Sequence, residues 1–485
     1  MAPSGAEPMG GAITREPDIP LSAMRPSTPL SAALPPLIMG TATFNSQYNA
    51  DPYALPTTEL VQRALSRGIR AFDTSPYYGP AEELLGRALA TEFVQSTFPR
   101  ESYHILTKVG RVAGSSFDYS RSWIRHSVRR SLQRLHTSYL DVVYCHDVEF
   151  VTPAEVVAAV QELRNLRDQG LIRYVGISGY PVDTLSELAE TILRETGEPL
   201  DIVMSYANFT LQNTRLHSRA LPRLIAAGVD VVPNASPLGM GLLRRDGVPI
   251  GSMGDFHPAP DALRTAVARA AERASSYGEK LEVIAIRFAL ESWLRVGARA
   301  GGLGAPLAKG ADADPGFLSV ANLGTGKRLG VSVMGVSNIA ELDETLRVWH
   351  SIVDGLENWG EDEDDYFNTK LSTPSTPSLG AVPTAENAEI MTPGEGITDR
   401  AWSRARGAHI LELAREIRDI VGADWVDYVW DSPGPGFVNT LTEDHLHLKN
   451  RIQAEERTGK IDLSSLSPSE EPMLTPPSDA ERQLA

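Results

Sequence analysis

The stretch YLDVVYCHDVEFVTPAEVVAAVQELRNLRDQGLIRYVGIS, residues 139–178, contains one complete unit of strand, helix and strand. Its two ends, residues 139–146 and 172–178, are short and almost continuously apolar, which is typical of parallel strands buried on both faces. Residues 154–169 between them have the period of an amphipathic helix that stops at Gly170. The stretch therefore predicts two neighbouring parallel strands joined by a helix.

The same alternation continues on both sides of this unit, from Leu37 to His350. Six further short apolar runs are candidate strands, at residues 37–43, 69–73, 103–109, 201–206, 229–234 and 331–336. Helical patterns lie between them, such as residues 121–135, and Thr57 or Thr58 is the expected N-cap of a helix over residues 59–67. Eight such units favour a closed (β/α)8 TIM barrel over an open doubly wound sheet, which has fewer strands.

Segments of different composition flank and interrupt the predicted barrel, which spans residues 36–350. Residues 1–35 are rich in Pro, Ala, Ser and Gly and predict a disordered N-terminal arm. The Gly-rich insertion at 299–329 lacks the Gly-Lys-Ser/Thr ending of a phosphate loop, so it predicts a flexible surface loop. Three further segments are expected after the barrel: an acidic, Ser/Thr/Pro-rich disordered linker at 351–398, a helix and aromatic segment docking on the barrel at 399–440, and a mostly disordered tail at 441–485.

The overall composition indicates which kinds of binding partner and which cellular compartment to expect. The 485 residues include 45 Lys plus Arg against 62 Asp plus Glu, which gives a formal charge of −17, and a single cysteine, Cys145. An acidic chain has no general attraction to nucleic acid or to anionic membranes. One cysteine allows no intrachain disulfide and no Cys-cluster metal site, and no secretion signal or transmembrane segment is visible. We expect a cytoplasmic protein that binds a small molecule without a metal, as a monomer or a dimer.

Four polar residues fall where the strands of such a barrel end. Asp73, Lys108 and His146 end the second, third and fourth strands, and Tyr78 lies in the loop after Asp73. Active sites of these barrels form at this end. Buried opposite charges on neighbouring strands are expected to pair, and an ammonium next to Tyr78 is expected to lower the pKa of the phenol, which makes it a general acid or base. Taken singly, the same residues also fit a structural ion pair and a core histidine.

The segments that carry these residues resemble the aldo-keto reductase family. GIRAFDTSPYYGPAEELLG from Gly68, TKVG from Thr107 and LDVVYCHDVE from Leu140 are similar to its segments with the catalytic Asp and Tyr, Lys and His. LRDQGLIRYVGISGY, ASPLGMGLL and VMGVSNIAELDET are similar to its cofactor-binding segments. The resemblance implies a barrel that transfers hydride to or from a nicotinamide. It also implies Tyr78 as proton donor or acceptor, tuned by Lys108 and Asp73, with His146 orienting the reacting oxygen.

Within the family, the sequence segments NASPLGMGLL from Asn234 and WDSPG from Trp430 are most similar to those of NAD-dependent sugar dehydrogenases. That resemblance implies oxidation of an aldose, of the D-arabinose or L-galactose type, at C1 to the lactone. An NADPH-dependent aldehyde or ketone reductase remains an alternative, and so does a cofactor-binding regulatory partner protein without catalysis. The aromatic residues Trp425, Tyr428 and Trp430 either pack in the core or close over the sugar.

The resemblance also implies a set of cofactor contacts and a cofactor preference. Gly335 and Glu341 stand where NADP-preferring members carry Lys and Arg, and a carboxylate would repel a 2′-phosphate, so NAD is favoured over NADP. Two expected contacts are replaced, by Gly179 in place of Asn and by Ala235 in place of a stacking Tyr, and the usual sixth-strand Gln has no clear counterpart. The implied cofactor-binding residues are Ser178, Ser236, Leu238, Gly239, Gly335, Val336, Ser337, Asn338, Glu341 and Glu344.

Overall fold

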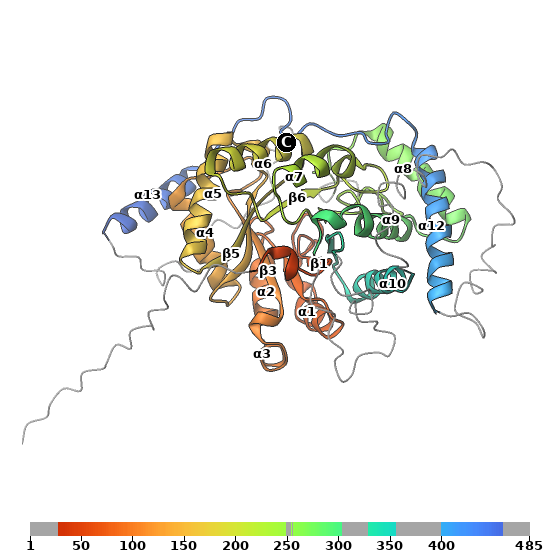
Figure 1. The fold of residues 1–485 in the computed structure, drawn as a ribbon, viewed down its shortest axis with the longest axis horizontal. Coiled ribbons are helices and arrows are strands. Elements are labelled where there is room, and N and C mark those ends of the chain that lie inside the picture. Colours follow the sequence, from red (N-terminus) through yellow and green to blue (C-terminus); the bar gives the residue numbers. More distant parts are fainter. Residues whose placement is uncertain (1–27, 249–253, 255, 303–327, 356–398, 459–485) are drawn as a thin grey trace, which may run out of the picture.

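Eight parallel strands close into a barrel in chain order, and helices surround it (Figure 1). The computed structural model describes residues 28–248, 254, 256–302, 328–355 and 399–458. The predicted (β/α)8 barrel is thereby confirmed. The strands are β1 Leu37–Gly40, β2 Ala71–Asp73, β3 His104–Val109, β4 Leu140–His146, β5 Ile172–Gly179, β6 Ile202–Tyr206, β7 Asn234–Ala235 and β8 Ser332–Gly335.

The barrel helices follow the strands in the order that the sequence predicts. The helix between β4 and β5 begins with a capping box, in which Thr152 and Glu155 satisfy each other's backbone N–H groups. The described barrel helices of six or more residues are α1 Thr57–Ser66, α2 Ala81–Leu89, α3 Glu92–Thr97, α4 Arg121–Arg134, α5 Pro153–Asp168, α6 Val182–Thr196, α7 Leu221–Ala226, α8 Asp261–Ser276, α9 Leu281–Val296 and α10 Ile339–Gly355.

Two local predictions are wrong, and proline explains both. Helix α1 begins at Thr57 directly after Pro56, and neither Thr57 nor Thr58 is its N-cap. The ring of Pro56 fixes its backbone φ, so the chain enters the helix earlier than the hydroxyl pattern suggests. The seventh strand, expected over residues 229–234, is reduced to Asn234–Ala235 with an isolated bridge at Val231, because Pro233 has no N–H to give to the sheet.

Part of the predicted N-terminal arm is ordered and covers the N-terminal end of the barrel interior. Leu30 and Leu34 are fully buried and join Ile38, Ala71 and Leu106 in the interior core. The phenol of Tyr174 on β5 donates to the Thr28 carbonyl at 3.0 Å. The prediction of a disordered arm is therefore wrong for residues 28–35, because the open end of the barrel needs an apolar cover. Residues 1–27 lie outside the described part.

The segment after the barrel folds back onto it. Helix α12, Asp399–Val421, packs against α8, α9 and α10 (Figure 1), and its Ile410, Leu413 and Ile417 are buried. Beyond it, the side chain of Gln212 donates to the carbonyls of Trp425 and Tyr428 at 2.6 and 3.1 Å. Of the linker predicted at 351–398, residues 351–355 belong instead to the last turn of helix α10, and residues 356–398 lie outside the described residues. Most of the Gly-rich insertion, residues 303–327, also lies outside them.

A further helix, α13, occupies residues Glu443–Thr458 and packs against α4 (Figure 1). Its His445 pairs with Asp118 at 2.9 Å, and its Glu456 pairs with Arg125 on α4 at 2.8 Å. The prediction of a tail without regular structure is wrong for residues 443–458. No helix in the described part of the chain is both long and apolar enough to cross a membrane.

Candidate active site

Asp73 and Lys108 form a buried ion pair at the carboxyl ends of neighbouring strands. The Lys108 Nζ donates to Asp73 Oδ1 at 2.6 Å and to the Thr74 carbonyl at 2.8 Å. Both side chains are at most 5% exposed. The pairing is the one that the strand order predicts, because β2 and β3 are adjacent. Water is excluded from the pair, so the ammonium position is fixed relative to the residues around it.

Tyr78 lies in the turn between β2 and α2 and faces both Lys108 and His146. The Lys108 Nζ is 4.7 Å from the centroid of the Tyr78 ring. The same ring meets the His146 ring edge-on, with centroids 5.7 Å apart and planes at 88°. The side chain is half-buried. The loop after β2 thus carries Tyr78 back to the ends of β3 and β4.

The pKa of Tyr78 differs from the sequence-based expectation. Burial raises the pKa of the phenol well above its usual value, and the charges of Asp73 and Asp147 raise it further. The predicted net lowering of this pKa is wrong, because the Lys108 ammonium is paired with Asp73 and the effects that raise the pKa prevail. The raised pKa keeps Tyr78 as the neutral phenol at neutral pH, and the neutral phenol is a proton donor.

His146 ends β4 in an uncharged state. Burial lowers the pKa of the imidazole to about 3, although the Asp147 carboxylate raises it. The Nδ1 atom lies 3.2 Å from the Ser75 hydroxyl, which also accepts the Tyr77 N–H at 3.1 Å. This arrangement favours a hydroxyl that donates to Nδ1, so that Nε2 carries the ring proton. A neutral Nε2–H can orient a substrate oxygen by donating a hydrogen bond.

Three residues beside this group were not singled out from the sequence. Ser75 holds the imidazole, as described above. Arg111 and Asp147 form an ion pair in which the Arg111 guanidinium also lies 3.9 Å from the centroid of the Tyr77 ring. Burial alone would raise the pKa of Asp147, but the ion pair and hydrogen bond with the Arg111 guanidinium hold it below its ordinary value, so Asp147 is charged. In the sequence, Asp147 directly follows His146 and Arg111 lies close after Lys108. This proximity to the predicted catalytic residues is the one sequence feature that points to the Arg111–Asp147 pair.

Gly179, where the resemblance implies an Asn, leaves space that a carboxyl group fills. A side chain placed on Gly179 would meet the Glu149 Oε2 at 2.3 Å. Glu149 Oε1 accepts the Tyr180 N–H at 3.0 Å and the Ser432 hydroxyl at 2.9 Å. Burial and the nearby Asp147 charge raise the pKa of Glu149 to about 8. The C-terminal segment thus reaches the mouth of the barrel at the end of β5.

The aromatic residues of that segment divide between two environments. Trp430 stacks on Tyr180, with ring centroids 4.6 Å apart and planes at 8°, and its edge meets His257 at 5.5 Å. Trp425 and Tyr428 pack instead against the second apolar core around α12. Trp430 is therefore the residue of the three that the structure places beside the carboxyl end of β5.

The implied cofactor residues lie along the ends of β5, β7 and β8. Ser178 is the register partner of His146, and β7 pairs with β8. The loop after β7 starts with Ser236 and Gly239 in left-handed backbone, and the Ser236 hydroxyl accepts the Met240 N–H at 2.8 Å. Leu238 packs against both the main core and the core around α12. β7 and β8 are neighbours and β6 separates them from β5, so these segments lie on the same side of the barrel.

The loop after β8 leads into the N-terminus of α10. The Val336 carbonyl accepts the Thr43 hydroxyl at 2.7 Å. Asn338 Oδ1 accepts the Glu341 N–H at 2.9 Å, and Glu341 Oε2 accepts the Ser337 N–H at 2.7 Å. Glu344, one turn further, pairs with Lys280 at 3.1 Å. Glu341 is therefore bonded to the backbone at the start of the helix.

These residues fit a dinucleotide. The N-terminus of α10, a helix of 17 residues, favours a phosphate group. Gly40 and Gly335 are register partners on β1 and β8, and a side chain on Gly335 would meet Thr43 at 3.1 Å, so Thr43 packs directly against the backbone at this end of β8. Asn234 Oδ1 on β7 is buried without a partner in the described part of the chain. The unpartnered acceptor of Asn234, which could receive a carboxamide N–H, and the anion-favouring helix end suit a nicotinamide dinucleotide.

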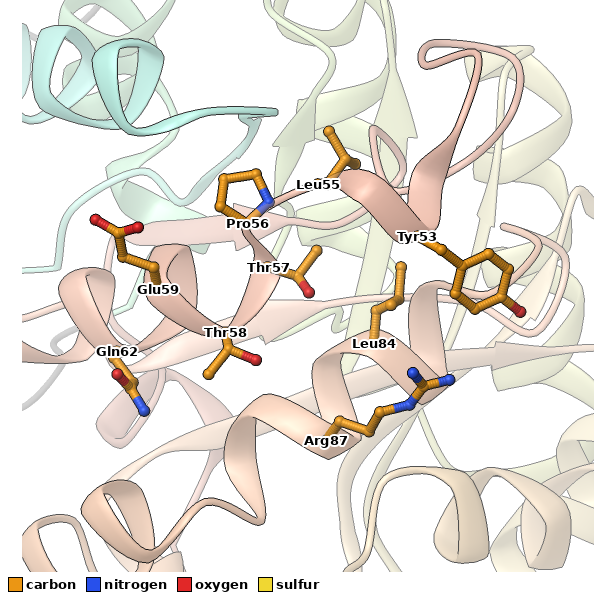
Figure 2. A pocket seen from close by; sticks show the side chains of 9 residues that line it. All are labelled: Tyr53, Leu55, Pro56, Thr57, Thr58, Glu59, Gln62, Leu84 and Arg87. Atoms are coloured by element: carbon orange, nitrogen blue, oxygen red, sulfur yellow. The ribbon is translucent and has the colours of Figure 1, made fainter.

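A separate depression lies between α1 and α2, away from these residues (Figure 2). It is lined by Tyr53, Leu55, Pro56, Thr57, Thr58, Glu59, Gln62, Leu84 and Arg87. The guanidinium of Arg87 lies 5.7 Å from the centroid of the exposed Tyr53 ring. None of the predicted catalytic or cofactor-binding residues lines it. No group of three or more potential metal ligands is found among the described residues.

Comparisons with known proteins agree with this geometry. A model of the aldo/keto reductase family matches residues 36–354. The D-arabinose 1-dehydrogenase of Saccharomyces cerevisiae is 43% identical over 268 residues, which are 55% of this chain and 78% of that protein. The L-galactose dehydrogenase of Arabidopsis thaliana is 35% identical over 233 residues, 47% of this chain and 68% of that protein. The D-threo-aldose 1-dehydrogenase of Pseudomonas sp is 26% identical over 290 residues, 54% of this chain and 83% of that protein.

Proposed function

The chain belongs to the aldo/keto reductase family, and on that premise we propose that it is an NAD-dependent dehydrogenase of an aldose, of the D-arabinose or L-galactose type. As a family member it is an oxidoreductase that uses a nicotinamide cofactor. The observation that carries the proposal is the convergence of Tyr78, Lys108 and His146 at the mouth of the barrel. The similarity to two sugar dehydrogenases supports an aldose as the substrate.

In the proposed reaction, Tyr78 and His146 act on the C1 hydroxyl of the sugar. His146 Nε2–H donates to the C1 oxygen and orients it, and Tyr78 in its phenolate form takes the hydroxyl proton. NAD⁺ held along the ends of β5, β7 and β8 would supply the acceptor for the hydride of C1. The C1–H and O–H bonds break, the C1–O bond becomes a double bond, and a cyclic aldose leaves as the lactone. Oxidation thus releases one lactone, one NADH and one proton.

Lys108 and Asp73 act on Tyr78 rather than on the sugar. The ammonium of Lys108, 4.7 Å from the ring centroid, stabilises the phenolate when it forms. The carboxylate of Asp73 fixes that ammonium and at the same time favours the protonated phenol. The balance of these charges lets Tyr78 exchange a proton in both directions. In this reading the pair is a positioning and electrostatic element of the site.

The preference for NAD rests on the start of α10. By its resemblance to the cofactor loop of the family, Glu341 stands at a position where NADP-preferring members carry a basic residue, and its carboxylate would repel a 2′-phosphate. The same carboxylate could accept a hydrogen bond from the ribose hydroxyl of NAD. We therefore propose NAD as the physiological cofactor.

Spectrophotometric assays of NADH formation test this function. The purified full chain is given D-arabinose, L-galactose, L-fucose or L-xylose, with NAD⁺ and NADP⁺ in parallel. We expect turnover of at least one aldose with NAD⁺ preferred. Tyr78→Phe removes the proton acceptor, so we expect a loss of about 10²-fold or more in kcat, which is the scale of general base catalysis.

Tyr77→Phe is the matched control for that variant. Tyr77 is the neighbouring tyrosine and its ring also lies 5.8 Å from that of His146, but it has no proposed role in proton transfer. It should keep most of the activity. If no aldose is oxidised while NADPH supports reduction of simple aldehydes, the chain is a general reductase and the proposal fails.

A further inference from the structure

The ion pair of Arg111 and Asp147 borders the proposed reaction centre without a part in the proton or hydride transfer. Asp147 follows His146 directly, and its Oδ2 lies 3.5 Å from the His146 Nε2. Asp147 is 2% exposed, so its charge is held out of bulk water. A buried carboxylate beside a reacting group is costly unless it serves a partner or a ligand.

The backbone and the arginine fix this carboxylate in place. Asp147 has φ 54 and ψ 61, the left-handed conformation, which is uncommon for a residue with a side chain. Arg111 donates to Asp147 Oδ2 and to the Gly114 carbonyl at 3.2 Å, while its guanidinium lies over the Tyr77 ring. Asp147 Oδ1 makes no hydrogen bond within the described part of the chain. One oxygen is thus anchored and the other is available to a ligand.

The contact between Asp147 Oδ2 and His146 Nε2 at 3.5 Å places the carboxyl group beside the proposed reacting atoms. If the Nε2–H of His146 holds the reacting oxygen at C1, the next hydrogen-bonding group of an aldose is the hydroxyl on C2. Asp147 lies beside that same nitrogen, and a carboxylate accepts hydrogen bonds strongly when water is excluded. The rings of Tyr77, Phe117 and Phe150 around the Arg111 guanidinium exclude water from this corner.

We infer that Asp147, positioned by Arg111, binds the C2 hydroxyl of the sugar and selects aldoses over aldehydes and deoxy sugars that lack this group. The inference rests on the proposed aldose dehydrogenase function and names the group that gives it substrate selectivity. A substrate without the hydroxyl leaves the buried carboxylate unpaired. Sites built to hydrogen-bond a substrate hydroxyl reject its deoxy analogue by large factors for this reason.

A comparison of two sugars in one enzyme preparation tests the inference. D-Arabinose and 2-deoxy-D-ribose differ in the C2 hydroxyl alone, and their kcat/KM ratio is measured with NAD⁺ for wild type and for Asp147→Asn. The active fraction of each preparation cancels in the ratio, so partial misfolding of the variant does not affect it. We expect wild type to prefer D-arabinose and the ratio to fall about tenfold or more in Asp147→Asn, which is the scale of one hydrogen bond to a charged group.

Glu190→Gln is the matched control, because Glu190 is a carboxylate paired with Arg223 on the surface and distant in role from the site. Its ratio should equal that of wild type. An unchanged ratio in Asp147→Asn overturns the inference, and so does a wild-type enzyme that oxidises both sugars equally well. Oxidation of neither sugar by wild type counts instead against the proposed function and removes the premise of the inference.

Discussion

At the scale of single residues, the protonation state of Tyr78 depends on nearby charges whose effects on its pKa partly cancel. Lys108 is 4.7 Å from its ring, yet its ammonium is shared between Asp73 Oδ1 and the Thr74 carbonyl. Burial and two carboxylates, Asp73 and Asp147, then raise the pKa of the phenol. The resting enzyme is consequently poised as a proton donor, and oxidation requires that the phenol first lose its proton.

This state predicts opposite pH dependences for the two directions of the reaction. Because the pKa of Tyr78 is raised, the phenolate fraction grows with pH across the whole accessible range, and kcat/KM for oxidation should rise steadily from about pH 5 to about pH 10. Reduction uses the phenol and should stay level until alkaline pH. The pKa of His146, lowered to about 3, adds no inflection near neutrality. Initial rates over this range with both substrates check the prediction.

A contrary profile would be equally clear. If oxidation were already independent of pH near neutrality, or if it lost activity on deprotonation of a group with a pKa of about 6 to 7, Tyr78 and His146 would not have the protonation states described.

The sequence predicts some of these residues and not others for a physical reason. Asp73 and Lys108 end adjacent strands, so the order of the strands alone brings them together. Arg111 and Asp147 depend on loop geometry, in particular on the left-handed backbone at Asp147, which no hydrophobic period reports. The net effect of the nearby charges on the pKa of Tyr78 likewise depends on interatomic distances, which a sequence does not give. The sequence-based expectation for this pKa was therefore wrong in direction.

At the scale of elements, the N-terminus of α10 determines the choice of cofactor in this account. Glu341 Oε2 accepts the Ser337 N–H at 2.7 Å, so its carboxylate is held at the end of the helix where a dinucleotide phosphate is favoured. A negative charge there opposes an additional phosphate on the adenosine ribose. The geometry thus gives the proposed NAD preference a local electrostatic cause.

Replacing this carboxylate should change the cofactor preference. In Glu341→Arg, the kcat/KM for NADP⁺ relative to NAD⁺ should rise about tenfold or more, because a repulsion becomes an attraction. Glu344→Gln is the comparison variant, since the Glu344 charge is already balanced by Lys280 at 3.1 Å. Steady-state kinetics with both cofactors measure the ratio. A ratio that does not move in Glu341→Arg would place the adenosine ribose elsewhere.

Elements outside the repeating barrel were predicted less well than those inside it. Residues 28–34 belong to an arm rich in Pro, Ala, Ser and Gly, and α13 lies in a polar tail, so the composition of both segments indicates disorder. Each is ordered through a small number of contacts with the barrel, Leu30 and Leu34 in the interior and His445 with Asp118 against α4. Tertiary contacts of this kind override composition, and a single sequence does not show them.

At the scale of the whole molecule, the closed barrel was predictable because its signal is repeated eight times. Short apolar strands and amphipathic helices alternate from Leu37 to His350, and each repeat supports the same reading. The barrel then brings residues from β2, β3, β4, β5, β7 and β8 to one end. Function depends on this convergence, since the proton-transfer residues and the proposed cofactor edge come from different strands.

The most direct test of the account follows the hydrogen on C1 of the sugar. The full chain is incubated with NAD⁺ and D-arabinose, or another aldose that it oxidises, deuterated at C1. Direct hydride transfer from C1 predicts that deuterium appears on the nicotinamide ring of the NADH formed, that the deuterated sugar reacts more slowly, and that the other product is the lactone. Unlabelled NADH, with the deuterium released to water, would contradict direct hydride transfer from C1 at this site.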